Sequence, residues 1–242
     1  MCSSDLWNIQ HLEPYVDGVD SHAEFARALA ELDADVVLLQ EVDHFQERSG
    51  DVDQTALAAS LVGAKYSHFV ATPSVPGNYG IAMIAKNDVT QWHHKSLSGS
   101  PIGMRLTFLH HGEQVTFYAR DHERAVMTAT LTDGWLIANM HSSFVPGWAH
   151  FLVWRAARWA RKEAERQGLR LIFCGDLNLK SHWFLHLCGL SSLTHEPTFP
   201  AWQPDQHIDH ICVERHDPAV AVSAEVMRFG VSDHCALVVE FQ

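Results

Sequence analysis

The sequence lacks the features that mark membrane-embedded, secreted and cysteine-rich proteins. The 242-residue chain has no apolar run of the roughly 18–20 residues that a membrane-spanning helix needs. Five scattered cysteines include no C-x-x-C pair, which argues against a zinc ribbon or a disulfide scaffold and fits a reducing compartment. The first residues show no basic flank before an apolar block, the pattern of a secretory signal peptide. We therefore expect a cytoplasmic protein, unless truncation has removed a targeting signal.

Positive charge is also scarce. Seventeen lysines and arginines stand against 29 aspartates and glutamates, which gives a net charge of −12. Proteins that bind polyanions nonspecifically usually carry a basic face. Here the basic residues cluster mainly between Arg155 and Arg170, a pattern typical of a solvated helix. The balance disfavours a dedicated DNA-binding protein but permits a local anion site built on bound cations, because such ions can dominate the local field.

Apolar residues, at 47% of the chain, are sufficient for a packed core. No internal repeat, low-complexity tract or linker is present. Short apolar runs predict about a dozen strands, and helical spacing predicts three or four helices, one of them capped by Ser21. Strands and helices in mixed order favour two packed sheets with helices outside. The clearest strand predictions are 6–10, 35–40, 79–85, 135–141, 170–174 and 208–213, and the clearest helix predictions are 54–62, 148–167 and 181–187.

Polar residues that can bind metal or move protons recur where predicted strands end. They are Asn8, Glu41, His141, Asp176, Asn178, Asp209, His210, Asp233 and His234. Taken singly, each has an ordinary structural explanation as a turn residue, a helix cap, an Asx turn or a strand edge. Six such places in one chain are harder to explain in that way. Since the ends of adjacent strands converge on one rim of a sheet, these residues predict a shared site.

These segments resemble the endonuclease/exonuclease/phosphatase family, which has the deoxyribonuclease I-like fold. The resemblance implies an α/β protein built as a four-layer sandwich, in which helices flank two packed mixed β-sheets, and a single domain over residues 1–242. The matching pieces occur in the family's order and are Trp7-Asn8-Ile9, Leu39-Gln40-Glu41-Val42, Tyr79-Gly80-Ile81-Ala82, Asn139-Met140-His141, Gly175-Asp176-Leu177-Asn178, Thr198-Phe199-Pro200, Ile208-Asp209-His210-Ile211 and Ser232-Asp233-His234.

The resemblance implies a divalent metal bound by Glu41, with Asn8 beside it and Asp233 joining the metal shell. Hard oxygen ligands of this kind suit Mg²⁺ or Mn²⁺. Such a cation neutralises the charge of a phosphodiester while a nucleophile attacks it.

The resemblance also implies the roles around the reacting phosphate. His234 is expected to be the general base that activates water, with Asp209 orienting its imidazole. Asp176 and Asn178 would bind phosphoryl oxygens and position the nucleophile or leaving group, and His141 would donate a hydrogen bond to a nonbridging oxygen.

Two further residues have open alternatives. Tyr79 fits a phosphate contact and aromatic core packing equally well. Arg124 fits a phosphate contact and a surface salt bridge equally well.

The chain departs from the family's pattern at its start, where Cys2-Ser3-Ser4-Asp5 stands in place of apolar strand residues. We hypothesise that residues 1–6 are not native, a prediction that mapping the raw coding reads tests. The chain also lacks the long basic insertions expected of an abasic-site DNA repair enzyme.

The residues thus predict a metal-dependent phosphoesterase, a nuclease or phosphatase in the broad sense, acting on a phosphodiester. Nucleic acid, phospholipid head groups, inositol phosphates and small nucleotides all remain open as substrates, and no stable protein partner is expected. A catalytically silent binding protein on the same scaffold is the alternative. A third interpretation, a structural metal-binding protein, is set aside on the expectation that the histidines form no chelating set.

Overall fold

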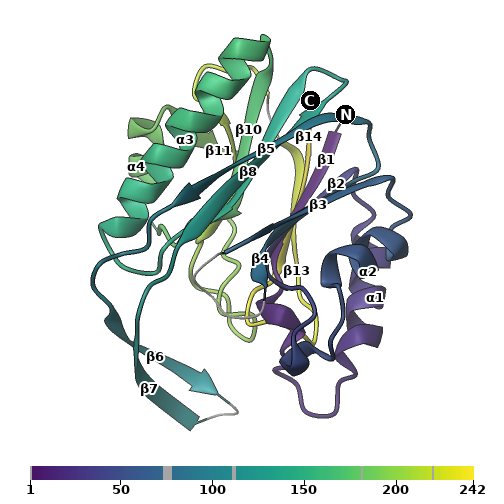
Figure 1. Ribbon diagram of the computed structural model, residues 1–242, viewed down its shortest axis with the longest axis vertical. Coiled ribbons are helices and arrows are strands. Elements are labelled where there is room, and N and C mark those ends of the chain that lie inside the picture. The colour runs from purple at the N-terminus through teal and green to yellow at the C-terminus, as the bar shows by residue number, and fades with distance from the viewer. Residues whose placement is uncertain (1, 73–77, 111–112, 181, 220) are drawn as a thin grey trace.

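Two six-stranded sheets pack face to face in the computed structural model, which describes residues 2–72, 78–110, 113–180, 182–219 and 221–242 (Figure 1). The first sheet has the order β13 (Ala221–Met227), β14 (Ala236–Phe241), β1 (Cys2–Asn8), β2 (Val36–Asp43), β4 (Tyr79–Ala85) and β3 (Tyr66–Ala71). The second has the order β11 (Leu190–Ser192), β12 (Asp209–Glu214), β10 (Arg170–Asp176), β9 (Trp135–His141), β8 (Arg124–Leu131) and β5 (Val89–Leu97).

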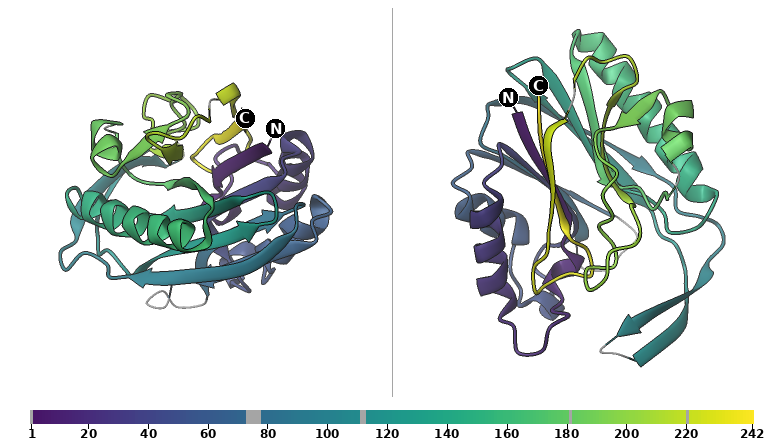
Figure 2. Two further views of the ribbon diagram at one scale, coloured as in Figure 1. Left: turned by 90° about the horizontal axis from the view of Figure 1, so that it is seen from above. Right: turned by 180° about the vertical axis from the view of Figure 1, so that it is seen from behind.

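Helices cover the outer face of each sheet (Figure 2). The first sheet carries α1 (Ser21–Leu32) and α2 (Gln54–Leu61), and the second carries α3 (Trp148–Gln167) and α4 (His182–Leu187). Short 3₁₀ turns lie at η1 (Gln10–Leu12) and η2 (Glu47–Ser49). This arrangement confirms the predicted four-layer α/β sandwich. No helix in the described part of the chain is both long and apolar enough to span a membrane.

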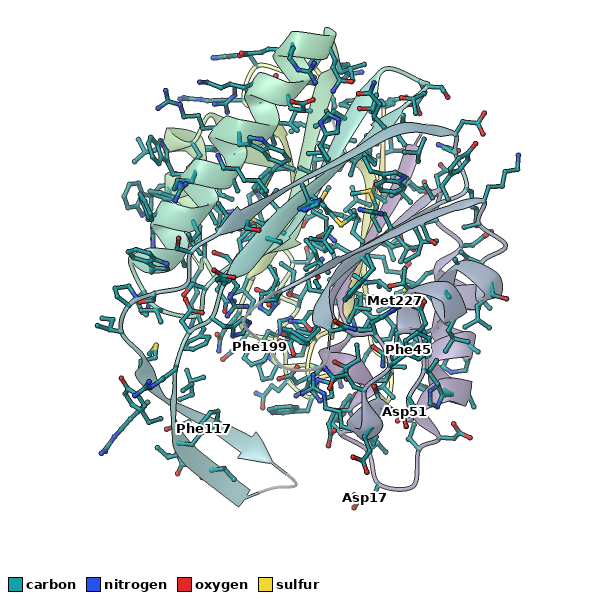
Figure 3. The ribbon with its side chains drawn as sticks, in the orientation of Figure 1. Asp17, Phe45, Asp51, Phe117, Phe199 and Met227 are labelled. Carbon is teal, nitrogen blue, oxygen red and sulfur yellow. The ribbon has the colours of Figure 1, made fainter. Side chains whose placement is uncertain are left out.

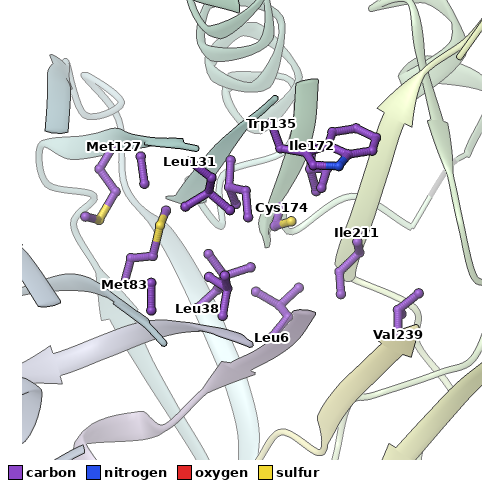
Figure 4. Close-up of a cluster of buried hydrophobic side chains, with 14 of the residues drawn as sticks. Leu6, Leu38, Met83, Met127, Leu131, Trp135, Ile172, Cys174, Ile211 and Val239 are labelled. Atoms are coloured by element: carbon purple, nitrogen blue, oxygen red, sulfur yellow. The ribbon is translucent and has the colours of Figure 1, made fainter. Parts of the chain in front are cut away.

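Strand alternation divides the core into three layers of buried side chains. Leu6 and Leu38 face the opposite sheet, where they join Met127 and Ile172, as Figure 4 shows. The intervening residues of β1 and β2 point outwards and pack under α1 and α2. Burying one such leucine contributes roughly 1.5–3 kcal/mol before the cost of ordering it. The inter-sheet layer therefore holds the two sheets in a fixed relation and positions whatever lies at their ends.

Two parallel strand pairs bring distant segments to one end of the sandwich. In the first sheet β1 runs parallel to β2, and in the second β9 runs parallel to β10, while the remaining pairs are antiparallel. Parallel neighbours need a crossover, which α1 and α3 provide. The carboxyl ends of each pair consequently meet at one edge, and the amino-terminal ends of the antiparallel β12 and β14 arrive beside them.

Three details differ from the sequence predictions, and the bounds of the other elements named there differ by at most three residues. The first strand begins at Cys2 rather than Leu6 and ends at Asn8, because residues 2–6 pair with β14 and residues 4–8 pair with β2. Asp20 rather than Ser21 caps α1, since its carboxylate accepts from two backbone N–H groups. The predicted helix over 181–187 forms from His182, and Ser181 lies outside the described residues.

A two-stranded hairpin, β6 (Met104–His110) and β7 (Glu113–Ala119), projects from the body beyond the edge of the second sheet. Figure 3 places Phe117 on this hairpin and Phe199 at the neighbouring end of the sheets. The hairpin carries exposed apolar side chains, among them Tyr118, which is 60% exposed.

Candidate active site

The predicted site residues lie together at the end of the sandwich where the parallel strands finish. Asn8 ends β1, while His141 and Asp176 end β9 and β10. Strand register pairs Asp176 with His141 on one side and with Asp209 on the other. Three candidate residues thus form one row across the second sheet, and the first sheet faces them with Asn8 and Glu41.

A bulge in β2 brings Glu41 into the site. The register with β4 shifts between Gln40 and Val42, and Glu41 has a φ of 54°. Regular alternation would turn Glu41 towards the outer helices, because Leu39 already points that way. The extra residue lets Gln40 and Glu41 both face inwards, a common use of bulges beside functional sites.

An amide at the end of β1 holds two carboxylates together. The Nδ2 group of Asn8 donates to Glu41 Oε1 at 3.2 Å and to Asp176 Oδ2 at 3.0 Å. Its Oδ1 accepts from the backbone N–H of Gln10 at 3.1 Å, which fixes the orientation of the amide. His141 Nε2 lies 3.5 Å from Asp176 Oδ2 and 4.0 Å from Glu41 Oε1. In this arrangement Asn8 presents N–H groups to the site and its oxygen to the backbone.

The second half of the site is a histidine–aspartate pair. His234 Nδ1 lies 2.9 Å from Asp209 Oδ2, and both side chains are buried. The hydroxyl of Thr198 donates to the same Asp209 oxygen. The other ring nitrogen, His234 Nε2, lies 3.8 Å from Asp176 Oδ2 and 3.9 Å from Asp233 Oδ1. One ring nitrogen of His234 is therefore held by Asp209, and the other is directed at the carboxylates of Asp176 and Asp233.

Burial and crowding of like charges shift the pKa values of these groups strongly. Burial, followed by the charge of Asp209, raises the pKa of Asp176 to about 7. Burial also raises the pKa of Asp233 to about 6. Burial alone would lower the pKa of His234, but the neighbouring Asp209 carboxylate outweighs it and raises that pKa to about 10. The pKa of His141 falls well below its usual value, first through burial and then through the charge of Arg124.

The donor set fits a hard divalent cation. The carboxylates of Glu41, Asp176, Asp209 and Asp233 gather around His141 and His234. Donor atoms of Asp176, Asp209 and His234 lie within 4.8 Å of one another. The side chains of Glu41 and Asp233 are 24% and 27% exposed, so oxygen donors remain accessible at the rim. A bound Mg²⁺ or Mn²⁺ would relieve the repulsion among these groups.

The remaining sequence candidates have local partners. The backbone N–H of Asn178 donates to Asp176 Oδ1 at 3.1 Å, so the Asx turn is formed, and its side chain faces the carbonyl of Ser142 at 3.5 Å. Tyr79 is buried, with the guanidinium of Arg48 at 5.5 Å from its ring centroid.

Arg124 forms a salt bridge with Asp121 at 3.0 Å, and both side chains are buried. The surface salt bridge considered from the sequence is therefore an interior one.

Thr198, Phe199 and Gln40 stand within the matching motifs, but the sequence assigns them no role. Thr198 binds Asp209, and the Phe199 ring packs at 4.8 Å from the ring of His234, centroid to centroid. Gln40 Nε2 donates to Asn139 Oδ1 at 2.7 Å, which joins the two sheets directly beneath the site. All three residues are visible in the sequence, but their partners are set by the fold.

Comparison with known proteins identifies the class. The chain belongs to the Endonuclease/Exonuclease/phosphatase family, whose sequence profile matches residues 6–234. No curated protein gives a significant match.

Several solved structures share the fold over the whole chain. The catalytic domain of human Nocturnin, with bound sulfate, aligns with a TM-score of 0.66 and 20% identity, covering 100% of this chain and 94% of that one. An endonuclease/exonuclease/phosphatase from Beutenbergia cavernae gives 0.64 and 17%, covering 100% and 71%. A mannosyl-6-phosphatase from Bacteroides thetaiotaomicron gives 0.63 and 13%, covering 100% of both chains.

Proposed function

We propose that this protein is a divalent-metal-dependent phosphoesterase that hydrolyses a phosphodiester. The observation that carries the proposal is the His234–Asp209 pair, whose free Nε2 faces the carboxylates of Asp176 and Asp233. Membership of a family rich in phosphoester hydrolases supports the same conclusion. The natural substrate class is left to experiment, although the net charge of −12 disfavours long DNA.

In the proposed reaction, His234 Nε2 takes a proton from a water molecule as the water oxygen attacks phosphorus. The new P–O bond forms as the ester P–O bond breaks, solvent protonates the leaving alkoxide to the alcohol, and the His234 imidazolium then returns its proton to solvent. Asp209 holds Nδ1–H and stabilises the imidazolium that forms, while Thr198 holds Asp209. A positioned base of this kind contributes roughly 10²–10⁴-fold to the rate.

The other residues hold the phosphate and its charge. Glu41 and Asp233 would bind the cation, with Asn8 keeping Glu41 and Asp176 in place. A bound Mg²⁺ or Mn²⁺ would supply positive charge that offsets the carboxylates and the phosphate, and this would weaken the stabilisation of a protonated His234.

We further propose that His141 donates to a nonbridging phosphoryl oxygen. Asn178, together with Asp176, would position the attacking and leaving groups. The low pKa of His141 keeps its imidazole neutral, so it can donate from one nitrogen without adding a full charge.

The proposal is tested with bis(p-nitrophenyl) phosphate in Mg²⁺ or Mn²⁺, with and without EDTA. We expect turnover that EDTA abolishes and that His234→Ala reduces by roughly 10²–10⁴-fold. His94→Ala serves as the matched control, because His94 is exposed on β5 outside the site. Circular dichroism checks that each variant is folded.

Turnover that survives both chelation and the His234 substitution would refute the mechanism. A folded protein with no turnover on this substrate or on plasmid DNA, RNA, sphingomyelin and phosphoinositides would favour the silent binding protein instead. Activity on one member of that panel would name the substrate class.

A further inference from the structure

A second cluster of titratable side chains lies behind the candidate active site, on the opposite face of β12. Asp209 faces the space between the sheets, as Ile211 does, whereas His210 points to the outer face together with Cys212. Around His210 gather His207, which precedes the strand, and His182, which begins α4. This histidine cluster comprises His182, His207 and His210.

The three imidazoles are close enough to share one ligand. One ring nitrogen from each lies within 4.8 Å of the other two, and His207 Nδ1 is 3.1 Å from His182 Nε2. The rings of His207 and His210 are 4.1 Å apart, centroid to centroid. A fourth imidazole, that of His195, has its ring centroid 4.5 Å from that of His182.

The cluster is buried, and several of its nitrogens have no partner. His207 is 8% exposed and His210 is fully buried. The nitrogens His182 Nδ1, His207 Nε2 and His210 Nδ1 are shielded from solvent and make no hydrogen bond. Unpartnered buried polar atoms are costly, and in this cluster each of three neighbouring imidazoles leaves one ring nitrogen without a partner.

The imidazoles are held in the neutral form that binds transition metals. Burial, followed by the neighbouring imidazoles, lowers the pKa of His207 to about 2. Burial lowers the pKa of His210 to about 4, against the opposing effect of its hydrogen bond to Leu179. The pKa of His182 is lowered by burial and by His195. Neutral imidazole is a common metal ligand near neutral pH, whereas imidazolium is not one.

One ring is also oriented by an outer hydrogen bond. His210 Nε2 lies 2.8 Å from the carbonyl oxygen of Leu179, which can only accept. The proton therefore sits on Nε2, and the lone pair of Nδ1 is left free. Metal-binding histidines commonly donate their second ring N–H to a carbonyl or carboxylate in this way.

We propose that His182, His207 and His210 form a structural Zn²⁺ site. Zinc–nitrogen bonds of about 2.0–2.1 Å place tetrahedral ligand nitrogens about 3.3 Å apart, close to the observed His182–His207 separation. Borderline-soft Zn²⁺ suits an all-imidazole set, whereas Mg²⁺ prefers oxygen. Three histidines thus lie close enough together to hold a metal, although no chelating set was expected from their spacing. His182 and His186 have H-x₃-H spacing, His207 and His210 have H-x₂-H spacing, and the fold joins His182 to the second pair.

The position of this site suits a structural role, which does not depend on whether the protein hydrolyses a phosphoester. His195 and His207 flank the loop that carries Thr198 and Phe199, the two residues in contact with the His234–Asp209 pair. The same loop is tied to the chain at Cys235, whose backbone N–H donates to the Thr198 carbonyl. A zinc ion would clamp this loop to β12 and α4.

The test measures zinc content and stability rather than activity. The purified chain is loaded with ZnSO₄, dialysed against excess Mg²⁺ and assayed for zinc by mass spectrometry, in parallel with Co²⁺ loading. We expect one tightly held zinc per chain and the intense visible bands of tetrahedral Co²⁺. His182→Ala, at a partly exposed ligand, should weaken binding by more than about 100-fold. Glu41→Gln, in the candidate active site, and the exposed-site control His94→Ala should bind zinc as the wild type does.

Two results would overturn the proposal. Zinc that is lost in Glu41→Gln but kept in His182→Ala would place the ion in the acidic centre instead. A wild-type chain that retains no zinc and shows only weak octahedral Co²⁺ bands would leave the histidine cluster without a metal. If His182→Ala does not fold, the measurement is repeated with His207→Asn, a substitution close in size. A melting curve with and without zinc shows whether each variant is folded and whether zinc stabilises it.

Discussion

Two buried histidine-containing clusters lie on opposite faces of β12, and their imidazoles behave in opposite ways. His234, beside Asp209, has its pKa raised to about 10, whereas His207, among other imidazoles, has its pKa lowered to about 2. Both side chains are largely buried, with exposures of 5% and 8%. Burial alone therefore does not decide the protonation of a histidine in this protein. Burial lowers both pKa values, and beside His234 the Asp209 carboxylate outweighs that effect.

The same difference separates the ligands that the two clusters suit. Carboxylate oxygens dominate around His234, and they favour a hard cation such as Mg²⁺. The histidine cluster contains no carboxylate, and its neutral nitrogens favour Zn²⁺. Adjacent residues of one strand, Asp209 and His210, thus belong to two chemically distinct sites, because alternation sends their side chains to opposite faces.

The largest effect is expected from removing the negative charge of Asp209, which raises the pKa of His234. Asp209→Asn leaves a side chain of the same size but takes away the carboxylate that raises the pKa of His234. In the metal-free protein we expect the pKa of His234 to fall well below 10. NMR titration of the His234 ring measures this change. We expect turnover of bis(p-nitrophenyl) phosphate to fall by roughly 10²–10⁴-fold. An unchanged His234 titration would show that Asp209 does not control this imidazole.

Asp5 on β1 belongs to neither cluster, and its pKa shows the effect of burial on an acid that has no imidazole or ion-pair partner. Both of its oxygens are buried without a hydrogen bond, and its pKa is raised to about 8, mainly by burial. The folded state holds the proton more tightly than the unfolded state, so stability falls as pH rises from about 4 to about 8. At pH 7 the cost is up to about 4 kcal/mol.

Asp5→Val should remove this cost, because the register partners of Asp5 are Val37 and Val238. We expect higher stability at pH 7 and a flatter pH profile, measured by urea unfolding at pH 4 and at pH 9. Asp133→Asn, at an exposed turn, is the control that should change neither. A stabilisation equal at both pH values would contradict the role of the buried charge.

The smallest effect is expected at Thr198, on the loop that lies between the two clusters. Thr198→Val keeps the shape but removes the hydroxyl that donates to Asp209. Losing one hydrogen bond to a buried carboxylate costs about 1–3 kcal/mol, so we expect lower stability in chemical unfolding and turnover reduced by about tenfold. Thr198→Ser, which keeps the hydroxyl, should restore turnover. If serine fails to do so, packing rather than the hydrogen bond explains the effect.

Much of the sandwich could be predicted from the chain. Strands such as Tyr79–Ala85 and Trp135–His141 have the predicted bounds, because continuous apolar runs between polar ends have few alternatives to a buried strand. The start of β1 could not be predicted. Ser4 and Asp5 are poor strand residues, and their pairing with β2 and β14 outweighs that preference. Whether residues 1–6 are native remains a prediction for the coding reads, and the single domain and the cytoplasmic location likewise stay predictions.

The amino-acid sequence by itself determined which polar residues stand at the ends of apolar strands, since the alternation of apolar and polar residues is local. Only the tertiary structure decided their partners. The bulge at Glu41, the hydroxyl of Thr198 on Asp209, and the meeting of His182 with His207 and His210 all depend on how distant segments pack. A side chain's pKa and ligand preference come from its neighbours in space, and spacing along the chain does not encode those neighbours.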